Sequence, residues 1–132
     1  MSKAHGITFQ SSKFDVASET PNPINPIYGQ SLLLWLRGKI GAPYNVSEPA
    51  PEDWGWYVDV TGSGTTYLVG ASADPDEGNA SLEWHLQIHK HRSFKDNLTG
   101  ANKLTSDDAL TARIASILRA DPEIRAVEIE IP

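Results

Sequence analysis

Three histidines in the second half of the chain have the residue type and the spacing to carry chemistry. His85, His89 and His91 occupy odd-numbered positions of one segment, and Glu83 precedes them in the same pattern. If that segment is a strand, these four side chains share one face, because successive residues of a strand point to opposite faces. Histidine is the commonest protein metal ligand and titrates near neutral pH. The pattern therefore predicts either a site for a divalent metal such as zinc or a polar strand face.

Strand geometry limits which histidines can bind one ion. His89 and His91 are roughly 6.8 Å apart along a strand, and two imidazole side chains can close that distance over a metal. His85 lies roughly 13.5 Å from His89 and cannot easily join them. A catalytic metal needs a third protein ligand, and Asp59 and Glu128 are the carboxylates expected on the same face. The predicted metal set is His89, His91 and Asp59, which would serve a hydrolase-like enzyme by activating water.

Other catalytic signatures are missing or incomplete in the sequence. The chain has no cysteine, which excludes disulfides, zinc–thiolate sites and cysteine nucleophiles. The glycine-rich stretch at residues 62–66 lacks the lysine of a phosphate-binding loop, and an extended pattern follows it instead of a helix. No Gly-x-Ser-x-Gly nucleophile elbow is present. These absences favour a non-enzymatic protein over an enzyme.

The elements that position the histidines follow from the alternation of apolar and polar residues. Residues 52–92 predict a meander of three antiparallel strands. The glycines at positions 62 and 64 predict a tight hairpin between the first strand and the second, which covers residues 65–72. The third strand has the clearest pattern, since its even-numbered residues from 82 to 88 are all apolar. This third strand carries His85 and His89.

Two helices and two further strands are predicted to flank the meander. Asn25 and Pro26 form a typical helix start, and the apolar stripe that follows predicts a helix to about Ile40. A second stripe predicts a helix from about residue 105 to the stop at Pro122. Residues 93–104 between the meander and this helix are polar and are expected to be irregular. Alternation at residues 6–16 predicts one strand with a bulge or two short pieces, and alternation at residues 125–131 predicts the last strand. A further short strand is allowed at residues 44–46, just before the meander.

These elements predict an α+β fold in one domain, residues 1–132. The expected order is β-α-β-β-β-α-β, as a two-layer sandwich with a largely antiparallel sheet and two helices on one face. The strand order within the sheet stays open. The residues expected to face the helices are Trp54, Trp56, Val58, Tyr67, Val69, Trp84, Leu86, Ile88, Val127 and Ile129.

The opposite face of the sheet is expected to be open. An open face is either simply solvated or used to bind a partner. The side chains expected on it are Tyr57, Asp59, Thr66, Leu68, His85, Gln87, His89, Glu128 and Glu130. The predicted binding set within this group is Tyr57, Leu68, His85, Gln87 and His89.

The tryptophans allow two interpretations. Trp54 and Trp56 are expected to pack in the core, since large aromatic residues dominate burial. Gly55 between them indicates a bulge or the close approach of another backbone. In the alternative, Trp54, Trp56 and Trp84 line a pocket for a small ligand.

Composition narrows the class of partner. The formal net charge is −6, which is unfavourable for nonspecific binding to nucleic acid. The one basic cluster, residues 89–95, is predicted to be a charged strand end, with contact to a phosphate or an acidic partner as the alternative. The first ten residues lack the apolar core of a signal peptide, and the longest apolar run, residues 32–36, is too short to span a membrane. We therefore expect a small acidic protein in the cytoplasm that binds a protein partner or itself, with the metal-assisted enzyme as the alternative.

Overall fold

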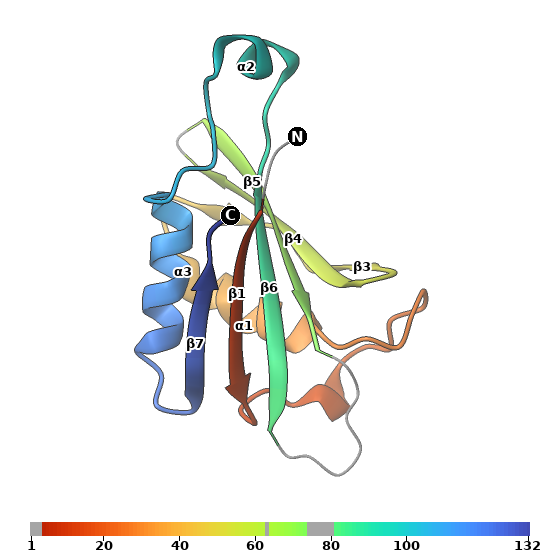
Figure 1. Ribbon diagram of the computed structural model, residues 1–132. Helices are drawn as coiled ribbons and strands as arrows, with labels where there is room; N and C mark the ends of the chain where they lie inside the picture. The colour runs from red at the N-terminus through yellow and green to blue at the C-terminus, as the bar shows by residue number, and fades with distance from the viewer. Residues whose placement is uncertain (1–3, 63, 74–80) are drawn as a thin grey trace.

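A computed structural model describes residues 4–62, 64–73 and 81–132. In these residues, seven antiparallel strands form one open sheet, accompanied by three α-helices and one short 3-10 helix, which confirms the α+β class (Figure 1). The strands are β1 (His5–Ser11), β2 (Asn45–Val46), β3 (Ala50–Glu52), β4 (Gly55–Gly62), β5 (Thr65–Ser72), β6 (Leu82–Lys90) and β7 (Ile124–Glu130). The helices are η1 (Val16–Ser18), α1 (Gln30–Ile40), α2 (Phe94–Thr99) and α3 (Ala109–Arg119). None of the helices in these ranges is long and apolar enough to cross a membrane.

The order of strands across the sheet is β2-β4-β5-β6-β1-β7, and β3 also pairs with β4. The predicted meander corresponds to β4, β5 and β6, which are neighbours in both sequence and space. Strand β1 inserts between β6 and β7, with Ile7 opposite Leu86 on one side and Ile129 on the other. The C-terminal strand β7 therefore forms one edge of the sheet.

The predicted element order lacks the short elements η1, β3 and α2, and the short strand allowed at residues 44–46 is β2. Strands β2 and β3 have two and three residues, too few to show alternation, and Pro51 lies within β3. Helix α2 has six residues and none of them is buried, so it carries no apolar stripe facing a core. Its local signal is a capping box, in which Ser93 and Asp96 each accept a hydrogen bond from the other's backbone amide.

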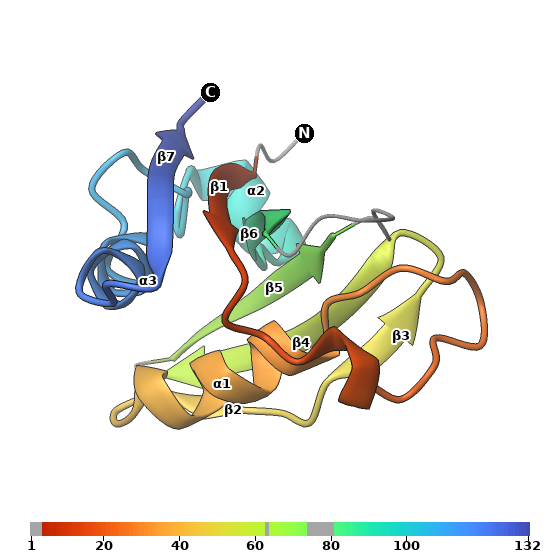
Figure 2. The same cartoon turned by 90° about the horizontal axis from the view of Figure 1, so that it is seen from below.

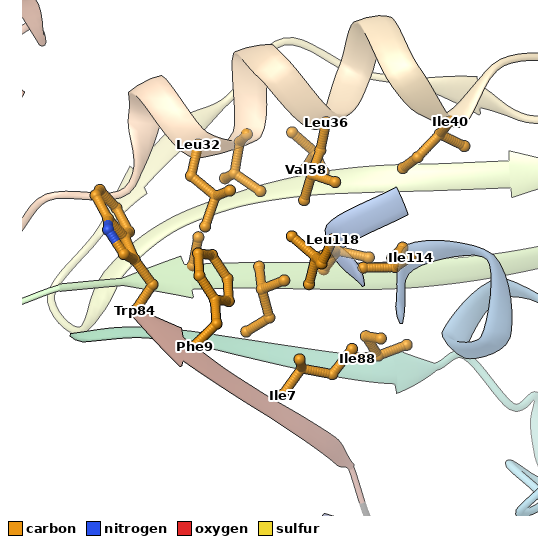
Figure 3. Close-up of a cluster of buried hydrophobic side chains, with 14 of the residues drawn as sticks. Ile7, Phe9, Leu32, Leu36, Ile40, Val58, Trp84, Ile88, Ile114 and Leu118 are labelled. Atoms are coloured by element: carbon orange, nitrogen blue, oxygen red, sulfur yellow. The ribbon is translucent and has the colours of Figure 1, made fainter. Parts of the chain in front are cut away.

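The core lies between one face of the sheet and helices α1 and α3 (Figures 1 and 2). Figure 3 shows side chains of α1 pointing toward the sheet, with side chains of α3 beside them. The buried residues labelled there are Ile7, Phe9, Leu32, Leu36, Ile40, Val58, Trp84, Ile88, Ile114 and Leu118. Burial of each large apolar side chain in this layer favours the folded state by about 1.5–3 kcal/mol.

Helix α1 begins at Gln30 and not at the predicted Asn25-Pro26 start. Just before the helix, Tyr28 forms an isolated β-bridge with Ala73 through two backbone hydrogen bonds of 3.0 Å. The Asn25 side chain donates to the carbonyl of Asp53 instead of capping the helix. The helix start is therefore set by contacts with distant strands, which local sequence signals do not encode.

A carboxylate from an earlier segment caps α1. Glu19 accepts hydrogen bonds from the backbone amides of Gly29 and Ser31 and from the Ser31 hydroxyl. It satisfies amides that have no partner within the helix, and its negative charge lies at the positive end of the helix dipole.

Glu19→Ala is expected to lower the free energy of unfolding by about 1–2 kcal/mol, since it removes both the cap and the favourable charge. Urea denaturation followed by circular dichroism measures the change. Glu19→Gln, which keeps one acceptor oxygen but not the charge, is expected to fall between the wild type and Glu19→Ala. Equal stability of all three proteins would contradict this role for Glu19.

Candidate functional site

The face of the sheet opposite α1 and α3 carries the candidate site. In Figure 1, α1 lies behind strands β1 and β6, so the viewer faces this open side. Strand pairing places side chains on it in rows. One row runs Tyr57, Gly70, Gln87, Gly6, Glu130, and the next runs Ser72, His85, Thr8, Glu128. A third row, toward the other end of the strands, contains Asp59, Leu68 and His89.

All five residues of the predicted binding set lie on strands of this face. Leu68 and His89 are direct cross-strand partners, and both are half-buried. Gln87 is exposed, and its side-chain oxygen lies 3.2 Å from Nε2 of His89. His85, also exposed, lies 3.3 Å from the Glu83 carboxylate. These polar pairs lie beside Tyr57 and Leu68, so the face combines apolar surface with hydrogen-bonding groups.

Trp54 lies on the open face, and the prediction that it faces the helices is wrong. It belongs to the turn between β3 and β4, and strand β4 begins only at Gly55. Two atoms of its ring, Cη2 and Cζ3, lie 2.6 Å from the place that a Cβ on Gly70 would take. Gly70 occupies the row between Tyr57 and Gln87. The indole ring therefore rests on a glycine in the middle of the candidate site.

Trp54 lies on the other face because the chain turns at this point. Alternation assigns Trp54 and Trp56 to the same face only if the strand is continuous through both. The backbone instead turns at Asp53 and Trp54, and Gly55 has a φ of 150° that side chains rarely adopt. The available signal was the Asp53-Trp54-Gly55 sequence after Pro51, which has the composition of a turn.

The other two tryptophans of the meander are core residues. Trp56 and Trp84 are 3% and 0% exposed, and their indole N–H groups donate to the carbonyls of Ile27 and Ser11. Trp54 lies on the opposite side of the sheet from both. The three rings do not line a common pocket, and the core interpretation is confirmed for Trp56 and Trp84.

A cavity of about 690 Å³ lies at the end of the open face next to α2. Its lining residues are Asp59, Thr66, Tyr67, Leu68, His89, Lys90, His91, Arg92 and Asn97. The three residues of the predicted metal set, Asp59, His89 and His91, thus border one cavity. His91 lies just after the end of β6, and its backbone amide donates to the carbonyl of Thr66. Among the described residues, no group of three or more His, Asp or Glu side chains is arranged to hold a metal ion. The metal set stays a prediction, which elemental analysis of natively purified protein would test.

A buried polar network lies on the inner side of the sheet and was not predicted. Asp108 is 5% exposed; one carboxylate oxygen accepts from the Tyr67 hydroxyl at 2.8 Å, and the other from the Thr111 backbone amide at 3.0 Å. The Thr111 hydroxyl donates its one proton to Asp108, at 3.3 Å. The same hydroxyl lies 2.8 Å from Nδ1 of His5, and because its proton is already used, Nδ1 is the donor in that bond. The Lys90 ammonium lies 4.0 Å from Asp108. The network joins four elements.

The network could not be found from local sequence. A helix that began at about residue 105, as predicted, would have Asp108 in its first turn, but Asp108 is the N-cap of α3. Tyr67 is 41 residues away from it in sequence and His5 is 106 residues from Thr111. Such long-range pairs depend on strand order, which the sequence left open.

Burial raises the pKa of the Tyr67 phenol, and the hydrogen bond to the Asp108 carboxylate raises it further. Above about pH 10 the unfolded chain loses this proton while the native protein keeps it, so the free energy of unfolding falls as the pH rises.

Tyr67→Phe is expected to remove this component of the pH dependence, which amounts to as much as about 1.4 kcal/mol per pH unit. Urea denaturation at about pH 9 and about pH 11 compares the variant with the wild type. Tyr57→Phe, on the open face, serves as the control and is expected to keep the wild-type slope. An unchanged slope in Tyr67→Phe would contradict the assignment.

Comparisons of the chain with protein-family models, with curated proteins and with solved structures find no match. Its function is therefore argued from its own residues.

Proposed function

We propose that this protein is a non-enzymatic binding protein that contacts a protein partner through the open face of its sheet. The observation that carries the proposal is the position of Trp54, a half-buried indole that lies over Gly70 among the side chains of that face. Tryptophan and tyrosine are the residues most often found at the energetic centre of protein interfaces. Trp54 and Tyr57 together supply such a centre.

The surroundings of Trp54 support a protein partner. Leu68 adds apolar surface, and His85, Gln87 and His89 add groups that form hydrogen bonds at the rim. Interfaces of moderate affinity combine an aromatic centre with a polar rim in this way. The strands beneath are paired on both sides, so the face is rigid and little conformational entropy is lost on binding.

The charge of the face indicates the chemistry of the partner. Strand pairing places four carboxylates and one guanidinium on it, namely Asp59, Glu83, Glu128, Glu130 and Arg125. This excess of negative charge favours a partner surface with lysine or arginine side chains. A guanidinium or ammonium group can also stack on the face of the Trp54 ring.

Affinity capture from an extract of the native cells tests the proposal. A variant with His85→Ala, Gln87→Ala and His89→Ala is expected to retain less than about a tenth of the captured partner. The free energy of unfolding is expected to change by no more than about 0.5 kcal/mol per substitution, because the three side chains lie on a solvent-facing surface.

The matched control carries Ser116→Ala and Arg119→Ala on the exposed side of α3. It is expected to capture the partner as the wild type does. Equal capture by the face variant and the control would show that the open face is not the binding surface.

A further inference from the structure

Helix α2 carries the most exposed large apolar side chains among the described residues. Phe94 and Leu98 are 79% and 71% exposed, one helical turn apart. Figure 1 shows α2 at one end of the molecule, standing beyond the strands of the sheet. We call residues 91–104, the part of the connection between β6 and α3 that contains α2, the prong.

The prong is held in place although α2 has no buried residue. The capping box fixes the start of the helix, and Gly100 ends it with a left-handed backbone conformation. Arg92 donates hydrogen bonds to the carbonyls of Asp96 and Ala101, which ties both ends of α2 to the end of β6. Phe94 and Leu98 are therefore presented on a pre-organised helix, which lowers the entropy cost of docking.

The charge of the prong is opposite to that of the rest of the chain. It contains Arg92, Lys95 and Lys103 with Asp96 as its one carboxylate, in a chain of formal net charge −6. The open face has an excess of carboxylates. It also has the aromatic and apolar surface, at Trp54, Tyr57 and Leu68, that two exposed apolar side chains would contact.

We infer that the prong of one copy of the chain docks on the open face of a second copy, and that the second copy returns the same contact. Phe94 and Leu98 pack on Trp54, Tyr57 and Leu68, and Lys95 lies near Asp59. We choose a second copy as the occupant because one chain carries both complementary surfaces. The prong is cationic and apolar, and the open face is anionic and aromatic. The inference rests on the proposed function, because it assigns an occupant to the same face.

A reciprocal contact closes as a twofold dimer, in which each prong and each face is used once. Light scattering coupled to size exclusion is expected to show the mass rising with protein concentration and levelling at twice the chain mass of 14.4 kDa. A mass that stays at that of one chain, or that grows without levelling, overturns the inference.

Phe94→Ser with Leu98→Ser is expected to weaken dimerisation at least about 30-fold. Since both side chains are exposed, the variant stays folded, which circular dichroism checks. Ile24→Ser is the matched control, because Ile24 is 55% exposed and lies outside the prong and the open face. If the double variant and the control dimerise equally, the prong is not the contact.

A charge exchange identifies the partner surface. Lys95→Glu alone and Asp59→Lys alone are each expected to weaken the dimer by about tenfold or less, and both substitutions in one chain are expected to restore it. Failure of the combined variant to recover affinity, while each single variant weakens it, overturns the assignment of Asp59 as the site where Lys95 docks.

These results separate the inference from the proposed function. A monomeric protein that still captures a partner through His85, Gln87 and His89 refutes the second copy as the occupant and leaves the binding face in place. A dimer that depends on Phe94 and Leu98 but not on the open face refutes the inferred contact without testing the capture of another protein.

Discussion

Asp108→Ala is expected to lower the free energy of unfolding by about 3–5 kcal/mol, the cost of removing one partner from a buried charged network. The carboxylate is 5% exposed and is the acceptor for the Tyr67 hydroxyl and the Thr111 backbone amide. Its loss leaves the hydroxyl of Tyr67 and the ammonium of Lys90 without their carboxylate on the inner side of the sheet. It also removes the N-cap of α3, which alone is worth about 1 kcal/mol.

The neighbouring residue supplies a matched control for this substitution. Asp107 is exposed and accepts a hydrogen bond from Thr105, so Asp107→Ala is expected to change stability by less than about 1 kcal/mol. Asp108→Asn, which keeps a good N-cap but not the charge, is expected to lie between the two. Urea denaturation measures all three. A loss of less than about 1 kcal/mol for Asp108→Ala would mean that the network does not hold β5, β6 and α3 together.

Gly70→Val is expected to reduce partner capture at least about 30-fold. The place of its Cβ lies 2.6 Å from two ring atoms of Trp54, so the indole must leave its position over β5. The ring is half-buried at a turn and can swing toward solvent, so we expect the fold to survive this change. Acrylamide quenching of tryptophan fluorescence is expected to increase, because Trp54 becomes more exposed.

Gly6→Ala is the control for this prediction. Gly6 lies in the same row of the open face, on β1, and its added methyl group would make only an ordinary 3.7 Å contact with Cβ of Glu130. It is expected to capture the partner as the wild type does, whereas Trp54→Ala is expected to resemble Gly70→Val. Normal capture by Gly70→Val, with the quenching increased, would remove Trp54 from the binding surface.

The elements that the sequence predicted well are those whose pattern is repeated over several residues. Strand β5 has the predicted bounds, and β6 has the predicted alternation, because each strand buries one face over its whole length. The same alternation placed Tyr57, Leu68, His85, Gln87 and His89 on one face. These predictions did not require knowing which distant segments contact each other, since period-two burial is a local property.

The failures share a different cause, which is contact between distant segments. The start of α1 depends on Glu19, and the position of Trp54 depends on Gly70 in another strand. The buried network connects His5 of β1 with α3 and, through Asp108, with Tyr67 of β5. Each of these features depends on which distant segments become neighbours in the fold. The order of the strands in the sheet decides this, and local sequence does not specify that order.

We propose above that the open face of the sheet is the binding surface. Photo-crosslinking in native cells tests it most directly, with p-benzoylphenylalanine placed at Gln87, in the middle of that face, or at Ser116, on the exposed side of α3. We expect a discrete crosslinked adduct from position 87 and none from position 116. An adduct from position 116 alone would contradict it.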